Sequence, residues 1–267
     1  MMIAIRSTIF NVVFYVHMIV VFVVTTPIYF FLPQRWCMAI VASWARRTLW
    51  LLRIICGTNV EFRGTENIPK GGRYILAGKH QSIWETFALL AVESNPGVVI
   101  KRELLYVPVW GWWAWKARMV YVTRGGGTAA LREIAEGSRK VLATGRPVFI
   151  FPEGTRRPPG ASADFKYGIA HLYKDVGLPV VPAALNSGLY WPRRSFMRFP
   201  GTIVVSFLPT IQPGLKPRAF LDRITNDIES ECDRLLLEAD SADQRPPFGP
   251  EATERLAELR SGPNLSA

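Results

Sequence analysis

From residue 58 onwards, short apolar runs with strand character alternate with longer helix-like segments, and this alternation restricts the fold more than any other feature. Strands that alternate with helices are typical of a mainly parallel sheet with helices packed on its faces. We therefore predict an α/β domain over residues 58–240, with a mainly parallel mixed sheet flanked by helices. The predicted strands are 59–62, 74–77, 98–100, 120–123, 148–151, 180–185 and 202–207, and the predicted helices are 84–93, 128–143, 166–176 and 218–238.

An apolar stretch without a charged side chain, residues 9–32, precedes this domain. It is long enough to cross or enter a bilayer, and it is too long for a typical signal-peptide core. Pro27 interrupts it, so a re-entrant hairpin is an alternative to a single hydrophobic helix. With the segment that follows it, we predict that residues 1–57 form a membrane-anchoring helical region.

The next segment, residues 35–56, has the pattern of an amphipathic helix. At about 100° per residue, its arginines fall on one side, and tryptophan and leucine residues occupy the others. This pattern favours an interfacial helix whose basic side faces lipid headgroups, while an ordinary core helix remains the alternative. The arginines in question are Arg35, Arg46 and Arg53.

Two further segments have a distinctive composition. Residues 191–199 mix aromatic and basic side chains, which suits a membrane interface, although a surface loop packed on the domain is equally compatible with the pattern. The residues of interest there are Trp191, Arg193 and Arg194. The polar, proline-rich residues 241–267 predict a loose C-terminal tail with a short helix over 251–259.

The formal net charge of +11 over 267 residues indicates an acidic partner. Nucleic acid, an anionic membrane and a phosphorylated substrate all qualify, but no recognisable nucleic-acid motif is present, which favours the last two. The three cysteines, Cys37, Cys56 and Cys232, form neither a C-x-x-C pair nor a metal-ligand spacing. We therefore expect no metal site and no disulfide framework.

The candidate chemistry lies at the end of the second predicted strand, where His80 is followed five residues later by Glu85. On a continuous helix these side chains would diverge by roughly 140°, so they meet only if the chain turns between them. Ser82 provides such a turn as a helix N-cap, with Glu85 in the S-x-x-E position. The pair is then either a general base with its orienting acid or merely a turn and a capping box.

Cationic residues follow two other predicted strands. Arg124 and three glycines come after 120–123, and Glu153-Gly154-Thr155-Arg156 comes after 148–151. The carboxyl ends of parallel strands meet at one edge of a sheet, so we expect these groups to gather near His80. Guanidinium groups suit phosphate oxygens, although a surface charge or a turn with an internal ion pair would explain the same residues.

Four ordered blocks in residues 75–185 resemble the glycerolipid acyltransferase family, in particular its bacterial 1-acyl-sn-glycerol-3-phosphate acyltransferases. The first block is His-x4-Glu here, with Glu85 where the family has aspartate. The third block, Phe-Pro-Glu-Gly-Thr-Arg, matches residues 151–156 in full, and the fourth is similar to Val180-Val181-Pro182. The family's second block is similar to the pattern formed in this chain by Lys101, Leu104, Pro108, Gly111 and Arg124.

This resemblance implies that His80 deprotonates the sn-2 hydroxyl of lysophosphatidic acid, with Glu85 orienting its imidazole. It also implies a phosphate site built from Lys101, Arg124 and residues 153–156. Acyl-CoA or acyl carrier protein (ACP) would supply the acyl group as co-substrate, without a metal or cofactor, at the cytoplasmic side of the bacterial inner membrane. Another lyso-lipid acceptor, such as a lyso-ornithine lipid or a lysophospholipid, and a non-catalytic lipid-binding protein remain alternatives.

Overall fold

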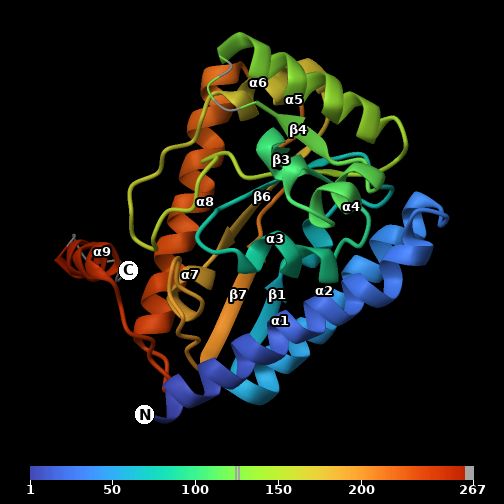
Figure 1. Cartoon of the computed structure of the whole chain (residues 1–267). Helices are drawn as coiled ribbons and strands as arrows, with labels where there is room; N and C mark the ends of the chain where they lie inside the picture. Colours follow the sequence, from blue (N-terminus) through green and yellow to red (C-terminus); the bar gives the residue numbers. More distant parts are fainter. Residues whose placement is uncertain (124, 126, 262–267) are drawn as a thin grey trace.

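The computed structural model describes residues 1–123, 125 and 127–261. Its strands form one seven-stranded sheet in the order β1-β7-β6-β2-β5-β3-β4 (Figure 1). Of the strand pairs between described residues, β6 and β7 are antiparallel and the others are parallel, which confirms the predicted mainly parallel mixed sheet. The strands are β1 (Thr58–Arg63), β2 (Ile75–Gly78), β3 (Gly97–Lys101), β4 (Val120–Val122), β5 (Val148–Ile150), β6 (Val180–Leu185) and β7 (Gly201–Phe207).

Helices cover both faces of the sheet (Figure 1). Successive side chains of β2 explain this arrangement, because alternate strand residues point to opposite faces. Leu76 packs in the hydrophobic core on the side of α1, α2 and α3, whereas Ile75 and Ala77 pack in the core on the side of α6 and α8. The α-helices are α1 (Met2–Tyr29), α2 (Gln34–Cys56), α3 (Trp84–Ala88), α4 (Trp110–Lys116), α5 (Gly127–Leu142), α6 (Gly168–Val176), α7 (Ser187–Tyr190), α8 (Pro217–Asp240) and α9 (Pro250–Ser261).

The apolar N-terminal segment is one continuous helix, α1, and α2 lies beside it (Figure 1). Pro27 falls within its last turn and does not divide it into a hairpin. Ser7, Phe10, Asn11 and Phe14 are buried at helical spacing, so one stripe of α1 packs on the body. Among the described residues, α1 alone is long and apolar enough to cross a membrane.

Three local predictions differ from the structure. The predicted helix 84–93 is α3 followed by the 3₁₀ turn η2 (Leu89–Ala91), and the short helices α4 and α7 were not predicted. The short helix predicted over 251–259 is present as α9, but the tail as far as residue 261 is not loose, because α9 buries Ala252 and Leu256 and its Arg255 pairs with Asp233 of α8 at 2.6 Å. Tertiary contacts with α8 thus hold α9 in place, although its polar composition predicts a solvent-exposed segment.

Candidate active site

The ends of the neighbouring parallel strands β2 and β5 bring the first and third sequence blocks together. His80 follows β2, and its backbone N–H donates to Glu153 Oε2 at 3.0 Å from the loop after β5. The backbone N–H of Arg157 in turn donates to the His80 carbonyl at 2.8 Å. The backbone at His80 is therefore fixed from both sides by the Glu153–Arg157 loop.

His80 and Glu85 are in direct contact. The imidazole Nδ1 lies 2.8 Å from Glu85 Oε1, and the same oxygen accepts the backbone N–H groups of Gln81 and Ser82 at 2.7 Å each. The helix begins at Trp84 and not directly after Ser82, whose hydroxyl accepts the Trp84 N–H at 3.2 Å. One carboxylate thus both closes the turn and orients the histidine, so the two interpretations of this motif are compatible.

The arrangement leaves one nitrogen of His80 available for chemistry. An ionised carboxylate only accepts hydrogen bonds, so the contact with Glu85 assigns the proton to Nδ1 and leaves a lone pair on Nε2. The ring stacks on Phe151 with a centroid separation of 4.4 Å, and the side chain remains 14% exposed. Glu85 is completely buried. A partly exposed imidazole oriented by a buried acid can act as a general base.

Glu153 is predicted to line a phosphate site, but the structure places it behind His80. Its carboxylate is buried, accepts the His80 N–H, and lies 3.0 Å from the Lys79 ammonium, which also binds Glu229 of α8 at 2.6 Å. Burial alone would lower the pKa of Lys79, but the carboxylates of Glu153 and Glu229 outweigh it, so that pKa lies above its ordinary value. A buried, ion-paired carboxylate supports the site from behind and does not offer itself to an anion.

The remaining residues of the predicted phosphate site lie at the surface of this edge. Gly154, at φ +63°, and Thr155 form an exposed turn after β5, and Arg156 follows them half-buried. Lys101 ends β3, and within the described residues neither its ammonium nor the Arg156 guanidinium makes a hydrogen bond or an ion pair. Both cations are thus available to an anion. Arg124 lies outside the described residues.

Comparison with known proteins places this geometry in a family. The model of the acyltransferase family matches residues 59–186. A 1-acyl-sn-glycerol-3-phosphate acyltransferase from Pseudomonas aeruginosa is 41% identical over 184 residues, covering 68% of this chain and 71% of that protein. The chain belongs to the acyltransferase family.

More distant relatives agree with this acyltransferase assignment. The human 1-acyl-sn-glycerol-3-phosphate acyltransferase alpha is 30% identical over 189 residues, with 68% of this chain and 67% of that protein covered. The crystal structure of the 1-acyl-sn-glycerophosphate acyltransferase PlsC from Thermotoga maritima superposes with a TM-score of 0.69 over 86% of this chain and 97% of that chain, at 22% identity. The latter comparison establishes the shared fold.

One residue predicted at the membrane interface of this acyltransferase lies elsewhere. Trp191 is 4% exposed, and its ring packs against Phe10 and Phe14 of α1 at centroid separations of 5.4 and 5.7 Å. The guanidinium of Arg198 lies over the same ring at 4.1 Å. The prediction for Trp191 is therefore wrong, because its segment folds beneath α1 and the indole fills the junction between this helix and the body.

The arginines of the predicted interface are all exposed. Arg35, Arg46 and Arg53 lie on α2, and Arg193 and Arg194 lie in the loop after α7. Arg193 also donates from Nη1 to the backbone carbonyl of Arg156 at 2.7 Å, which ties this loop to the phosphate-site candidate. The role of these arginines at a membrane stays a prediction.

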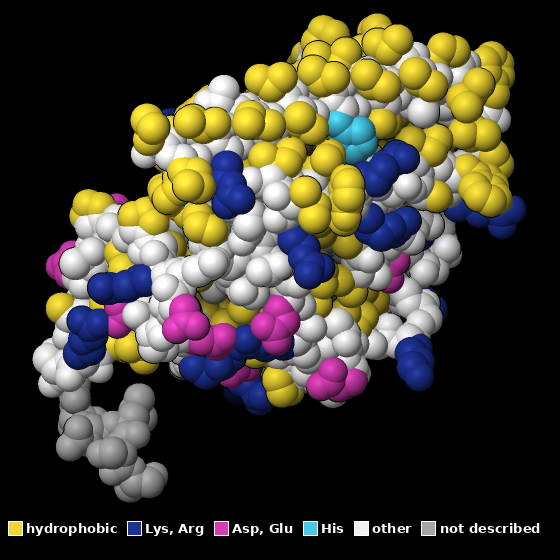
Figure 2. Space-filling view, turned by 90° about the horizontal axis from the view of Figure 1, so that it is seen from below, with side chains coloured by type: hydrophobic (Ala, Val, Ile, Leu, Met, Phe, Trp, Pro, Cys, Tyr) yellow, Lys and Arg dark blue, Asp and Glu magenta, His cyan; other side chains and the backbone are white. Residues whose placement is uncertain are grey.

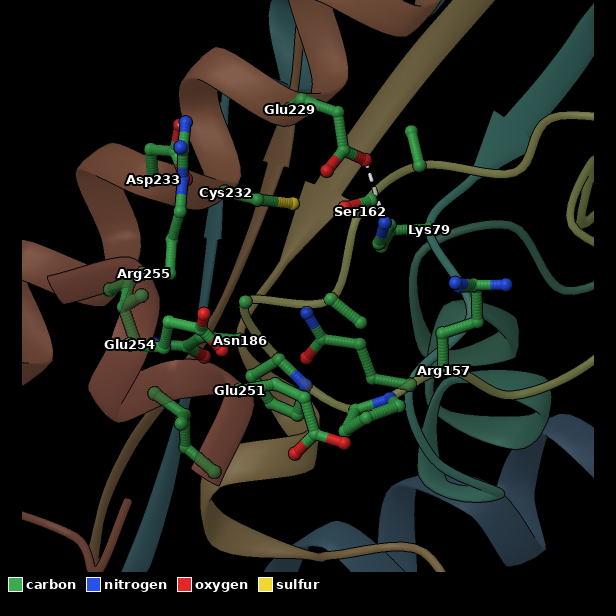
Figure 3. A pocket seen from close by; sticks show the side chains of 18 of the residues that line it. Lys79, Arg157, Ser162, Asn186, Glu229, Cys232, Asp233, Glu251, Glu254 and Arg255 are labelled. Atoms are coloured by element: carbon green, nitrogen blue, oxygen red, sulfur yellow. Dashed lines mark hydrogen bonds and ion pairs between the residues drawn. The ribbon is translucent and has the colours of Figure 1, made fainter. Parts of the chain in front are cut away.

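A hollow of about 590 Å³ lies between α8, α9 and residues 157–163 (Figure 3). Its wall includes the Lys79–Glu229 ion pair and the carboxylates of Asp233, Glu251 and Glu254, whereas His80 is not part of its lining. The sequence contained no signal for this pocket, because it depends on how the C-terminal helix α9 folds back onto α8. It is adjacent to the candidate active site but separate from the candidate base.

Proposed function

We propose that this acyltransferase transfers a fatty acyl group from a thioester, acyl-CoA or acyl-ACP, to the sn-2 hydroxyl of lysophosphatidic acid and so forms phosphatidic acid. The observation that carries the proposal is the 2.8 Å contact between His80 Nδ1 and Glu85 Oε1, with the ring partly open to solvent. The printed names of the relatives from Pseudomonas aeruginosa and Homo sapiens support the choice of acceptor.

In the proposed reaction, His80 Nε2 takes the proton of the acceptor hydroxyl as its oxygen attacks the thioester carbonyl carbon. The negative charge of Glu85 stabilises the imidazolium that forms. Collapse of the tetrahedral intermediate breaks the carbon–sulfur bond, and the imidazolium returns its proton to the departing thiolate. The base is thereby regenerated, and the step needs neither a metal nor a cofactor nor an acyl-enzyme.

The phosphate of the acceptor would bind at the surface edge formed by Arg156 and Lys101, with Arg124 as a further candidate. Arg156 has a planar fork that matches phosphate oxygens, and its guanidinium has no competing partner among the described residues. Thr155 adds a hydroxyl in the exposed turn beside it. Within this scheme Glu153 holds the backbone of His80 and does not contact the phosphate.

The geometry of α1 favours a helix that lies along a membrane surface over one that crosses it. Near its start, the Arg198 backbone N–H donates to the Ser7 hydroxyl at 2.9 Å. Near its end, Tyr29 stacks on Trp113 of α4 at 3.9 Å. These two anchor points are separated by roughly 33 Å of helix. Because both ends contact the rest of the protein, a membrane-crossing orientation would have to break one of these contacts.

The face of α1 and α2 that points away from the body is hydrophobic. It includes Val16, Val20, Val23 and Trp50, and Figure 2 shows a band of hydrophobic side chains bordered by lysine and arginine side chains. Such a surface matches the boundary between acyl chains and anionic headgroups. We infer attachment to the cytoplasmic side of the bacterial inner membrane, where the thioester donors are present.

The decisive experiment supplies purified protein with palmitoyl-CoA and lysophosphatidic acid and measures phosphatidic acid. His80→Ala should reduce turnover by at least 10²-fold, as expected for loss of a general base. His171→Ala on α6 is the matched control and should retain turnover. Full activity of His80→Ala would refute the role of this imidazole. A panel with lysophosphatidylcholine and a lyso-ornithine lipid would show whether another acceptor is preferred.

A further inference from the structure

The substitution of glutamate for aspartate in the first block requires a structural explanation. Glu85 carries one more methylene than the aspartate of the family pattern, yet its Oε1 still reaches His80 Nδ1 at 2.8 Å. We infer that Ser187 is a positioning residue for this reaction, which holds the longer acid in place through its second oxygen. The inference rests on the proposed roles of His80 and Glu85 and adds a third member to the pair.

The contact itself is short and completely enclosed. Ser187 Oγ donates to Glu85 Oε2 at 2.8 Å, and both side chains are 0% exposed. Ser187 begins α7, directly after β6, and lies 102 positions along the chain from Glu85. No water can take the place of the hydroxyl without repacking, because the surroundings of both side chains are filled by protein. The hydrogen bond is therefore the means by which Oε2 is satisfied.

The two oxygens of Glu85 have separate tasks. Oε1 accepts three donors, from His80 and from the backbone N–H groups of Gln81 and Ser82. Oε2 accepts only the Ser187 hydroxyl among the hydrogen bonds of the described residues. The terminal bond of a carboxylate has only broad rotational preferences. The donors to Oε1 hold one oxygen, and the Ser187 contact holds the other, which sets the plane of the carboxylate and keeps Oε1 aimed at the imidazole.

A second contact keeps α7 at the right distance. The backbone N–H of Gly188 donates to Gln81 Oε1 at 3.0 Å, so the segments 80–85 and 187–190 are joined at two adjacent points. A side chain at Gly188 would come within 2.9 Å of Pro159. The absence of a side chain there lets α7 approach closely enough for Ser187 to reach the acid.

This geometry explains why the longer acid suits this chain. Shortening Glu85 to aspartate withdraws the carboxylate by about one carbon–carbon bond, ~1.5 Å. One carboxylate cannot then contact both His80 Nδ1 and Ser187 Oγ. Because misplacement of a catalytic group by ~1 Å can cost as much as 10²-fold in rate, Glu85 and Ser187 form a matched pair.

The test is a double-mutant cycle in the phosphatidic acid assay. Ser187→Ala should lower kcat about tenfold, as expected for one hydrogen bond to a charged group, and should leave the KM for lysophosphatidic acid unchanged. Glu85→Asp should also lower kcat. In the Glu85→Asp protein, Ser187→Ala should have no further effect, because the hydrogen bond is already lost.

Controls separate positioning from a general loss of structure. Ser138→Ala changes another fully buried serine, on α5, and should leave kcat unchanged. Ser187→Cys keeps a side chain of the same connectivity, but its thiol is larger and a weaker donor, so its kcat should be reduced as well. Thermal melts of each variant establish that the measured protein is folded.

The outcomes distinguish this inference from the proposed function. If the wild type transfers no acyl group, or His80→Ala retains turnover, the proposed function fails and the role of Ser187 fails with it. If His80→Ala is inactive but Ser187→Ala has wild-type kcat, only the role of Ser187 is refuted. The role of Ser187 would also be refuted if Ser187→Ala lowered kcat by the same factor in the wild-type and Glu85→Asp backgrounds, since independent effects are additive.

Discussion

Lys79 and Glu153 form a buried ion pair, 3.0 Å long, directly behind the candidate base. Their side chains are 2% and 0% exposed, and Glu229 of α8 completes the cluster from the other side of the ammonium. Since Glu153 also accepts the backbone N–H of His80, this cluster connects helix α8 to the backbone of the candidate base. The cluster therefore affects both the stability of the protein and the geometry of its site.

We expect Lys79→Met to destabilise the protein by about 3–5 kcal/mol, because it leaves the Glu153 and Glu229 carboxylates without their counter-charge. Equilibrium urea denaturation measures the change in the free energy of unfolding. Lys166→Met is the control, since its partner Asp164 lies at the surface and such pairs contribute at most about 1 kcal/mol. Similar free energies of unfolding for the two variants would contradict the importance of the buried pair.

The same cluster predicts a loss of stability at alkaline pH. The pKa of Lys79 is raised above its ordinary value of 10.5, so the folded state holds this proton more tightly than the unfolded chain. The stabilisation is complete below pH 10.5 and is lost as the pH rises through the raised value. The difference in unfolding free energy between wild type and Lys79→Met should therefore narrow above this pH. A constant difference up to about pH 11.5 would disprove the linkage.

Glu85→Gln should lower kcat by roughly 10²–10⁴-fold with little change in KM. The amide has the shape of the carboxylate but lacks its charge, so it cannot stabilise the imidazolium that His80 becomes. Steady-state kinetics with lysophosphatidic acid measures both constants. Glu136→Gln, at an exposed position on α5, is the control and should keep wild-type kcat.

Arg156→Ala should raise the KM for lysophosphatidic acid by about 10- to 100-fold, the loss expected for a charge-assisted hydrogen bond to phosphate. A monoacylglycerol, which lacks the phosphate, should be acylated by the variant and the wild type at equal rates. Arg218→Ala at the exposed start of α8 is the control. A KM that Arg156→Ala leaves unchanged would remove this arginine from the phosphate site.

Two tryptophans should respond in opposite ways to truncation. Trp191→Ala empties a buried site and should cost about 3–5 kcal/mol of stability. Trp50→Ala, at an exposed position on α2, should change stability by at most about 0.5 kcal/mol but weaken binding to vesicles that contain phosphatidylglycerol. Thermal denaturation and vesicle sedimentation separate the two effects. Unchanged vesicle binding of Trp50→Ala would argue against this face as the membrane contact.

Patterns of neighbouring residues predicted most of the fold. Strand-like runs of three to six residues were recognisable because β2 and its neighbours are apolar on both faces, as buried parallel strands must be. Element ends were less predictable: the apolar character of residues 84–93 continues through α3 and η2, so it does not indicate that the α-helix gives way to a 3₁₀ turn at Leu89. The helix over 251–259 was predicted, but its packing on α8 was not, because the partner of Arg255, Asp233, is distant in sequence.

Local sequence patterns were sufficient to predict the α/β order, the apolar helix α1 and the His80–Glu85 pair, because each depends on residues within a few positions of one another. The tertiary structure alone decided that Trp191 is buried, that Glu153 faces Lys79, and that Ser187 reaches Glu85. The last of these contacts joins residues 102 positions apart, and no local spacing or composition encodes contacts of this kind. They arise only when the strands are ordered in the sheet and α1, α7 and α8 pack against it.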